Sequence, residues 1–224
     1  MSKALFITAT GTDVGKTYVT ALIVKKLRES GINAGYYKAA LSGAESISDS
    51  DAGYVNKTAE INQPESTLLS YMYKTAVSPH LAAKIEGDPV TLEKVKADFS
   101  KVSESYDFVT VEGAGGIVCP VRWDETTHIL LEDIIKTLDL DTVIVADAGL
   151  GTINAVITTA EYIKSRKINI KGVILNNWTG GIMQEDNVKM ITELTKLEVL
   201  AVVKKGDTDL DIAPKKLANL YKEI

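Results

Sequence analysis

The chain has 224 residues, 45% of them hydrophobic, and a formal net charge of −5, which is enough apolar material for one large core. It has no basic stripe for a nucleic-acid partner, and its N-terminal apolar run is too short for a signal peptide or a membrane span. Since Cys119 is the sole cysteine, no internal disulfide can form, which favours a reducing cytoplasm and a packing role for this residue.

The first predicted elements enclose a glycine loop. Residues 4–8 form a buried strand and residues 16–29 a helix, with Gly11-Thr12-Asp13-Val14-Gly15-Lys16-Thr17 between them. Strand, glycine loop and helix in this order are typical of a P-loop, whose backbone N–H groups surround phosphate oxygens. Lys16 can then reach the β- and γ-phosphates, and Thr17 can ligate Mg²⁺. Thr10 replaces the usual first glycine, and the alternative is an ordinary strand-turn-helix corner.

The next part of the chain mixes short elements. Asp51 marks a predicted helix start, where it is either an oxygen ligand or the helix cap. The other predicted segments are a strand over 34–38 that runs into 41–43, an extended piece over 68–77, and helices over 81–86 and 91–102.

The rest of the chain alternates between strands and helices. The predicted strands are 108–112, 142–146, 172–175 and 199–203, and the predicted helices are 130–138, 153–164, 183–194 and 215–221. Short β-branched strands that alternate with helices predict an α/β fold, a parallel sheet with helices on both faces. No linker divides the chain, so residues 1–224 are expected to form a single P-loop domain.

Ligands of such sheets bind at the carboxyl ends of the strands, where several candidate residues stand. Glu112 ends a strand and can hold Mg²⁺ facing Thr17, unless it is a solvated charge. Lys38 can neutralise a transferring phosphoryl group, or be solvated itself. Asn176 can read a purine edge or serve as a turn residue. The stretch 149–154 leads into a helix whose free N–H groups can hold a carboxylate, or it is only a tight turn.

Together these segments resemble the dethiobiotin synthetases, the ATP-dependent ring-closing enzymes of biotin synthesis, over nearly the whole chain. The resemblance rests on residues 11–17, 35–38, 42–43, 50–52, 78–80, 111–116, 150–154 and Asn176. It implies 7,8-diaminopelargonate, CO₂ and ATP with Mg²⁺ as substrates and cofactor, and a homodimer with sites at its interface. His80 and His128 lie far apart in the sequence, and we assign neither to a metal.

The resemblance also implies roles for individual residues. Lys16, Lys38 and Thr12 are the expected catalytic residues, and Thr17, Asp51 and Glu112 the expected Mg²⁺ ligands. The expected nucleotide contacts are Asp13, Val14, Gly15, Lys16, Thr17, Tyr18, Asp51, Glu112, Gly113, Ala114, Gly115, Asn176 and Asn177, with Asn176 at the base. The expected substrate contacts are Thr12, Lys38, Ser42, Gly151, Thr152 and Asn154, the last three from the neighbouring subunit.

Two positions depart from the family pattern, and two other classes compete. Asp13 replaces the glutamate of many members, and Lys204-Lys205-Gly206 replaces a proline-containing turn near the base, so the choice between ATP and GTP stays open.

A partitioning-type ATPase, a switch for protein or membrane partners, would carry a second lysine at the position of Gly11. Amide-forming enzymes of the cobalamin pathway carry a glutaminase domain, for which this chain lacks room. The synthetase interpretation is therefore preferred.

Overall fold

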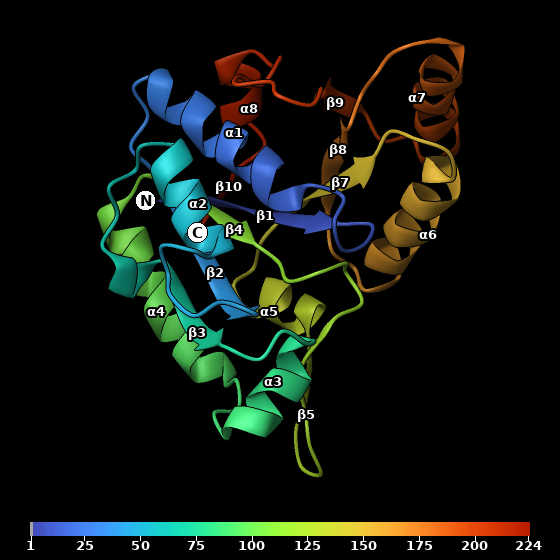
Figure 1. Ribbon diagram of the computed structural model, residues 1–224. Helices are drawn as coiled ribbons and strands as arrows, with labels where there is room; N and C mark the ends of the chain where they lie inside the picture. Colours follow the sequence, from blue (N-terminus) through green and yellow to red (C-terminus); the bar gives the residue numbers. More distant parts are fainter. Residues whose placement is uncertain (1) are drawn as a thin grey trace.

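The computed structural model describes residues 2–224, and its centre is a twisted sheet covered by helices (Figure 1). The order β3-β2-β4-β1-β7-β8-β9 is parallel throughout. These strands are β1 (Lys3–Ala9), β2 (Ala34–Ser42), β3 (Leu69–Tyr73), β4 (Phe108–Glu112), β7 (Thr142–Asp147), β8 (Ile170–Asn176) and β9 (Val199–Val202). The prediction of an α/β fold with a parallel sheet is confirmed.

Helices cover both faces of the sheet. The bounds are α1 (Lys16–Glu29), α2 (Asp51–Thr58), α3 (Pro79–Glu86), α4 (Leu92–Ser105), α5 (Leu131–Thr137), α6 (Thr152–Ser165), α7 (Ile182–Thr195) and α8 (Pro214–Ala218), with a short 3₁₀ turn, η1, over Glu65–Thr67. Leu5 and Ile7 of β1 pack with α1, α2 and α8, whereas Ala4 and Phe6 pack with the helices of the other face. Alternate residues of the central strand therefore enter two separate cores.

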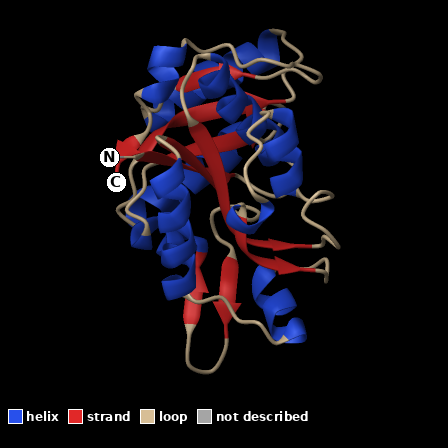
Figure 2. Ribbon diagram, turned by 90° about the vertical axis from the view of Figure 1, so that its left-hand side faces the viewer, coloured by secondary structure: helices blue, strands red, loops and turns tan. Residues whose placement is uncertain are grey.

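Two small pieces of sheet were not predicted. β5 (Pro120–Trp123) and β6 (His128–Leu130) form an antiparallel hairpin beside α3. β10 (Lys222–Glu223) pairs antiparallel with the start of β1, so the two ends of the chain lie together (Figure 2). The predicted helix 215–221 is correspondingly wrong at its end. The hydroxyl of buried Tyr221 lies 2.6 Å from the hydroxyl of Thr110, which draws the chain off the helix and toward the sheet.

The helix that begins at Asp51 is capped by its neighbour. The hydroxyl of Ser50 accepts a hydrogen bond from the backbone N–H of Gly53 at 3.3 Å. Asp51 is the first helical residue and points its carboxylate elsewhere, so the interpretation of Asp51 as a cap is wrong. Within residues 2–224 the structure has no helix with both the length and the apolar character needed to cross a membrane.

The cap predicts a loss of stability when it is removed. Ser50→Ala should lower the free energy of unfolding by about 1 kcal/mol, because an N–H group at the start of α2 loses its acceptor. Chemical denaturation measures the change. Ser48→Ala, which removes an exposed hydroxyl just before this helix, is the control and should change the stability little. Equal effects of the two substitutions would contradict the assignment of the cap.

Candidate active site

The loop between β1 and α1 has the backbone of a phosphate-binding turn. Gly15 precedes the helix with a φ of 85°, and Asp13 has a φ of 61°, both in the left-handed region. A Cβ atom on Gly15 would lie 2.0 Å from the side-chain nitrogen of Asn176, so only glycine fits. The first turn of α1 therefore opens directly onto the loop, with its N–H groups available to an anion.

Asn176 contacts the backbone of this loop through its side chain. At the end of β8, its side-chain nitrogen donates to the backbone carbonyl of Val14 at 2.9 Å. Its side-chain oxygen is buried and accepts no hydrogen bond within residues 2–224. The neighbouring Asn177 turns away and donates to Asp147 at 2.6 Å. Asn176 thus keeps one free acceptor beside the loop, whereas the side chain of Asn177 is engaged at the end of β7.

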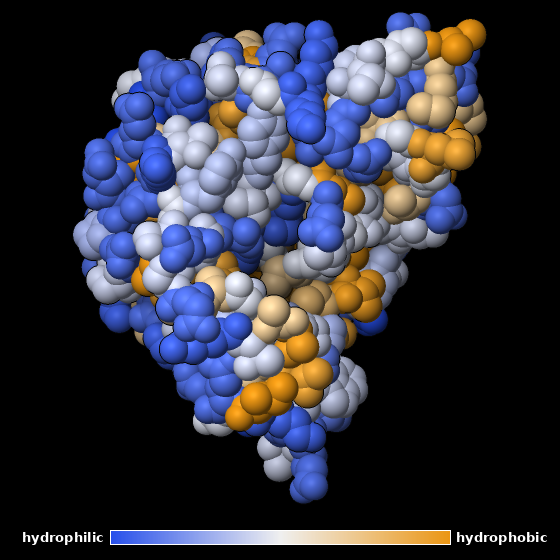
Figure 3. Space-filling model, viewed as in Figure 1, coloured by the Kyte–Doolittle hydropathy of each residue, from blue (hydrophilic) through white to orange (hydrophobic). Residues whose placement is uncertain are grey.

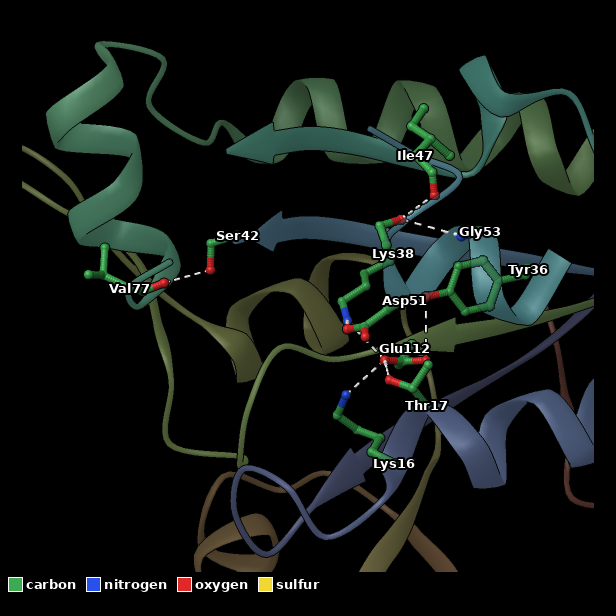
Figure 4. A network of polar contacts seen from close by, with 11 residues as sticks. Lys16, Thr17, Tyr36, Lys38, Ser42, Ile47, Asp51, Gly53, Val77 and Glu112 are labelled. Atoms are coloured by element: carbon green, nitrogen blue, oxygen red, sulfur yellow. Dashed lines mark hydrogen bonds and ion pairs between the residues drawn. The ribbon is translucent and has the colours of Figure 1, made fainter. Parts of the chain in front are cut away.

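The carboxylate of Glu112 is the meeting point of the site (Figure 4). Its Oε1 atom accepts hydrogen bonds from Lys16 at 2.8 Å, from the hydroxyl of Thr17 at 2.9 Å and from Lys38 at 2.9 Å. Lys38 also donates to Asp51 at 2.5 Å. The structure therefore brings together the predicted phosphate lysine, the second lysine and the three predicted Mg²⁺ ligands, which come from α1, β2, α2 and β4.

Burial sets the electrostatics of this group, which we call the Glu112 cluster (Lys16, Thr17, Lys38, Asp51 and Glu112). Glu112 is 1% exposed and Lys38 2%. Burial alone would raise the pKa of Glu112, but Lys16 and Lys38 outweigh it and lower this pKa to about 2. Burial lowers the pKa of Lys16, whereas for Lys38 the two carboxylates outweigh burial and raise the pKa. Glu112 is therefore ionised at neutral pH.

A cleft of about 770 Å³ opens above the cluster. Figure 3 shows this face hollowed between the upper part of the molecule and the part around α3. The predicted residues among those that line it are Thr12, Asp13, Gly15, Lys16, Thr17, Lys38, Ser42, Asp51, Ala114 and Gly115. The phosphate loop, both lysines and the carboxylate of Asp51 therefore line one open cleft, large enough for a small-molecule ligand, whereas Glu112 is buried and is not one of its lining residues.

Other predicted residues lie outside the lining of this cleft. Gly113 packs under it, where a Cβ atom would lie 2.8 Å from Leu131. The Tyr18 hydroxyl donates to the carbonyl of Asp207 instead of facing the loop. Gly151, Thr152 and Asn154 stand at the start of α6 and are not lining residues. Within residues 2–224, the structure does not bring α6 to the cleft.

From the sequence, no site role was assigned to one wall of the cleft or to one partner of Glu112, although residues 78–80 and 35–38 belong to the resemblance pattern. Ala76, Val77, Ser78 and Pro79, which lead into α3, line the cleft, and Ser42 donates to the carbonyl of Val77 at 2.6 Å. Pro79 in the first turn of a helix was the available signal. Tyr36 reaches Glu112 from β2 and was given no role of its own, because a tyrosine inside an apolar strand is typical of the core.

Cys119 has the packing role that was predicted. It is buried among apolar residues while one side borders the cleft. Burial raises the pKa of its thiol to about 11, so it stays protonated and is a poor nucleophile at neutral pH. His80 contacts Ser78, and His128 stacks on Trp123.

The oxygen ligands fit a magnesium ion that arrives with phosphates. Among residues 2–224, no group of three or more His, Cys, Asp and Glu side chains could hold a metal ion by itself. The hydroxyl of Thr17 and the carboxylate of Glu112 are nevertheless in contact, and Lys38 bridges Glu112 to the carboxylate of Asp51. Hard oxygen donors in small number, beside a phosphate loop, are the pattern that Mg²⁺ takes with nucleotides.

Comparison with known proteins gives close relatives. A family model described as an AAA domain matches residues 3–208. A protein of Brachyspira hyodysenteriae named ATP-dependent dethiobiotin synthetase BioD is 49% identical over 212 residues, which cover 94% of this chain and 96% of that protein. A protein of the same name from Clostridium botulinum is 48% identical over 229 residues, and the alignment covers 100% of this chain and 100% of that protein.

Solved structures with a similar fold are more distant in sequence. MinD, a cell division protein of Aquifex aeolicus, aligns with a TM-score of 0.55 at 14% identity, over 98% of this chain and 85% of that one. The signal recognition particle receptor FtsY of Elizabethkingia anophelis has a TM-score of 0.57 at 13% identity, over 100% of this chain and 65% of that one. At this identity the likeness shows the fold alone.

The low pKa of Glu112 predicts a pH dependence of stability. Because its pKa is lowered from 4.5 to about 2 by folding, its contribution is present above 4.5 and is lost as the pH falls toward 2. Between about pH 5 and about pH 3, the wild-type chain should lose on the order of 2 kcal/mol more unfolding free energy than Glu112→Gln. Chemical denaturation at both pH values measures this. Equal losses would show that Glu112 is not paired as described.

Proposed function

We propose roles for the site residues from one premise, that this chain belongs to the ATP-dependent dethiobiotin synthetase family. The protein is an ATP-dependent ligase that joins 7,8-diaminopelargonate and CO₂ into the cyclic urea of dethiobiotin, with release of ADP and phosphate. The observation that carries our assignment of roles is the convergence of Lys16 and Lys38 on one carboxylate oxygen at the mouth of the phosphate loop, at 2.8 and 2.9 Å.

The reaction needs positioning and charge neutralisation more than a covalent catalyst. One amine of the substrate takes up CO₂ as a carbamate, and a carbamate oxygen attacks the γ-phosphorus of ATP with release of ADP. The second amine then attacks the carbamoyl carbon, and phosphate leaves. Negative charge builds up on oxygen in the phosphoryl-transfer step, so cations held beforehand in a buried site lower the barrier.

We assign the two lysines to different parts of this chemistry. Lys16 lies in the phosphate loop and would contact the nucleotide phosphates. Lys38 comes from a separate strand, β2, and lies on the same cleft wall as Ser42. It would therefore stabilise the carbamate and the transferring phosphoryl group, while Ser42 and Thr12 orient the diamine and its carbamate. This division follows from the elements that carry the two lysines, α1 for Lys16 and β2 for Lys38.

Thr17, Asp51 and Glu112 would hold Mg²⁺ together with the nucleotide phosphates. A bound Mg²⁺ neutralises phosphate charge and holds the phosphates in one geometry. The carboxylates themselves fix the ammonium groups of Lys16 and Lys38, which limits the number of positions that the lysines can take. We also assign recognition of the base to Asn176, whose buried side-chain oxygen can accept from an exocyclic amino group.

We further propose that the protein acts as a homodimer in the cytoplasm. The start of α6 carries Gly151, Thr152 and Asn154 outside the lining of the cleft, and the hydroxyl of Thr152 is buried without a partner within the described chain. Leu150 next to it is 95% exposed, and Ile182 at the start of α7 is 88% exposed. Apolar side chains around a free helix start support contact with a neighbouring subunit, whose substrate carboxylate these residues would hold.

The function is tested by phosphate release. With 7,8-diaminopelargonate, bicarbonate and ATP with Mg²⁺, phosphate should appear in step with dethiobiotin, and omission of any component should stop both. The competing interpretation, a partitioning-type switch, predicts hydrolysis that a protein or membrane partner stimulates and that ignores the diamine. Hydrolysis at an unchanged rate without the diamine would contradict the proposed reaction.

Lys38 provides a sharper test of the assigned roles. Lys38→Ala should lower the rate of dethiobiotin formation by a hundredfold or more, about 3 kcal/mol of barrier, while ATP still binds. Product is measured by mass spectrometry and ATP affinity by calorimetry on one preparation. Lys74→Ala, which removes an exposed lysine paired with Glu45, is the control and should leave both unchanged. Equal loss of binding and product would place Lys38 in nucleotide binding instead.

A further inference from the structure

The two oxygens of the Glu112 carboxylate have different surroundings. Oε1 accepts from three donors, Lys16, Thr17 and Lys38, all of which line the cleft. Oε2 points away from them and accepts from one group, the hydroxyl of Tyr36, at 3.4 Å (Figure 4). Oε1 is therefore turned toward the donors that line the cleft, whereas Oε2 is turned toward the neutral hydroxyl of Tyr36.

The ring of Tyr36 is fixed in place. Its side chain is fully buried, two residues before Lys38 on β2, so both side chains leave the same face of the strand. Its backbone N–H donates to the side chain of Gln63 at 3.0 Å, and its carbonyl accepts from the same amide at 2.9 Å. Gln63 is itself buried and is joined to Asn56 of α2. Gln63 therefore holds the backbone of Tyr36, and the buried ring carries the hydroxyl to Oε2 of Glu112.

A carboxylate needs such a restraint. The last torsion of a glutamate side chain is broad and two-fold, so packing alone does not fix the plane of the carboxylate. A donor on the far oxygen sets that plane and leaves no buried oxygen without a partner. A lysine in this place would add a third cation, whereas a phenol restrains the carboxylate without changing the charge of the cluster.

We propose that Tyr36 is a positioning residue that orients Glu112, so that Oε1 is presented to Lys16, Thr17 and the magnesium site. This inference rests on the proposed Mg²⁺ role of Glu112. β2 then carries two residues that act on the site: Lys38, which lines the cleft, and Tyr36, whose hydroxyl acts only through Glu112.

The chain offers a matched control on the adjacent residue. Tyr37 is also fully buried on β2 but points to the opposite face, where its hydroxyl contacts Ser70 at 2.6 Å and donates to the carbonyl of Val95 at 3.1 Å. Tyr36→Phe and Tyr37→Phe each remove one buried hydroxyl and keep the ring. Only the first removes a hydrogen bond to Glu112.

The test measures ATP affinity by calorimetry in the absence of diamine, once with chelator and once with Mg²⁺. In the wild-type chain Mg²⁺ should tighten binding. In Tyr36→Phe we expect this gain to fall by about threefold to tenfold, the range of one hydrogen bond, while the affinity without metal changes less than about twofold. Tyr37→Phe should keep the full gain, and thermal unfolding verifies that each variant is folded.

The outcomes separate the inference from its premise. A wild-type chain whose ATP affinity ignores Mg²⁺ would overturn the proposed metal site and the role of Tyr36 with it. A normal gain in the wild-type chain that Tyr36→Phe retains in full would overturn the role of Tyr36 alone. An equal loss in both phenylalanine variants would show that the effect comes from general weakening of β2 and would likewise overturn it.

Discussion

The architecture of the site depends on one buried carboxylate. An ammonium group held away from water without a partner is very unfavourable, and here Lys16 and Lys38 are both buried. They are tolerated because Glu112 lies between them, and because Asp51 makes the cluster two positive and two negative charges. Glu112 is thus a condition for the burial of both lysines, and the lysines and carboxylates are already in contact without a ligand.

The order of the strands is what places these groups together. β4 lies between β2 and β1, with Glu112 in register with Lys38 on one side and with Ile7 on the other. Since all three strands run in the same direction, the loop after β1, the end of β4 and the lysine of β2 reach one edge of the sheet. α2 adds Asp51 from above β2, and the Asn56–Gln63 pair ties that helix to the strand.

Much of this was predictable from the sequence, for identifiable reasons. β4 and α1 have the predicted bounds, because a β-branched run and an apolar repeat after Gly-Lys-Thr are strong local signals. The common edge of Lys16, Lys38 and Glu112 follows from parallel strand direction, whereas their direct contact depends on the strand order β2-β4-β1. Ser50 was passed over as the cap because Asp51, one residue on, is equally good by type. Tyr36 and the hairpin of β5 and β6 were missed because their positions are set by distant partners, which local patterns do not record.

The pairing of β10 with β1 has a consequence for how the chain folds. The first residues of β1 pair with Lys222 and Glu223, from which nearly all the other elements of the sheet separate them in sequence. Contacts of such long sequence separation close late and slowly. The start of the strand that leads into the phosphate loop therefore keeps part of its edge unpaired until this contact forms, and an unpaired strand edge is a template for pairing with another chain.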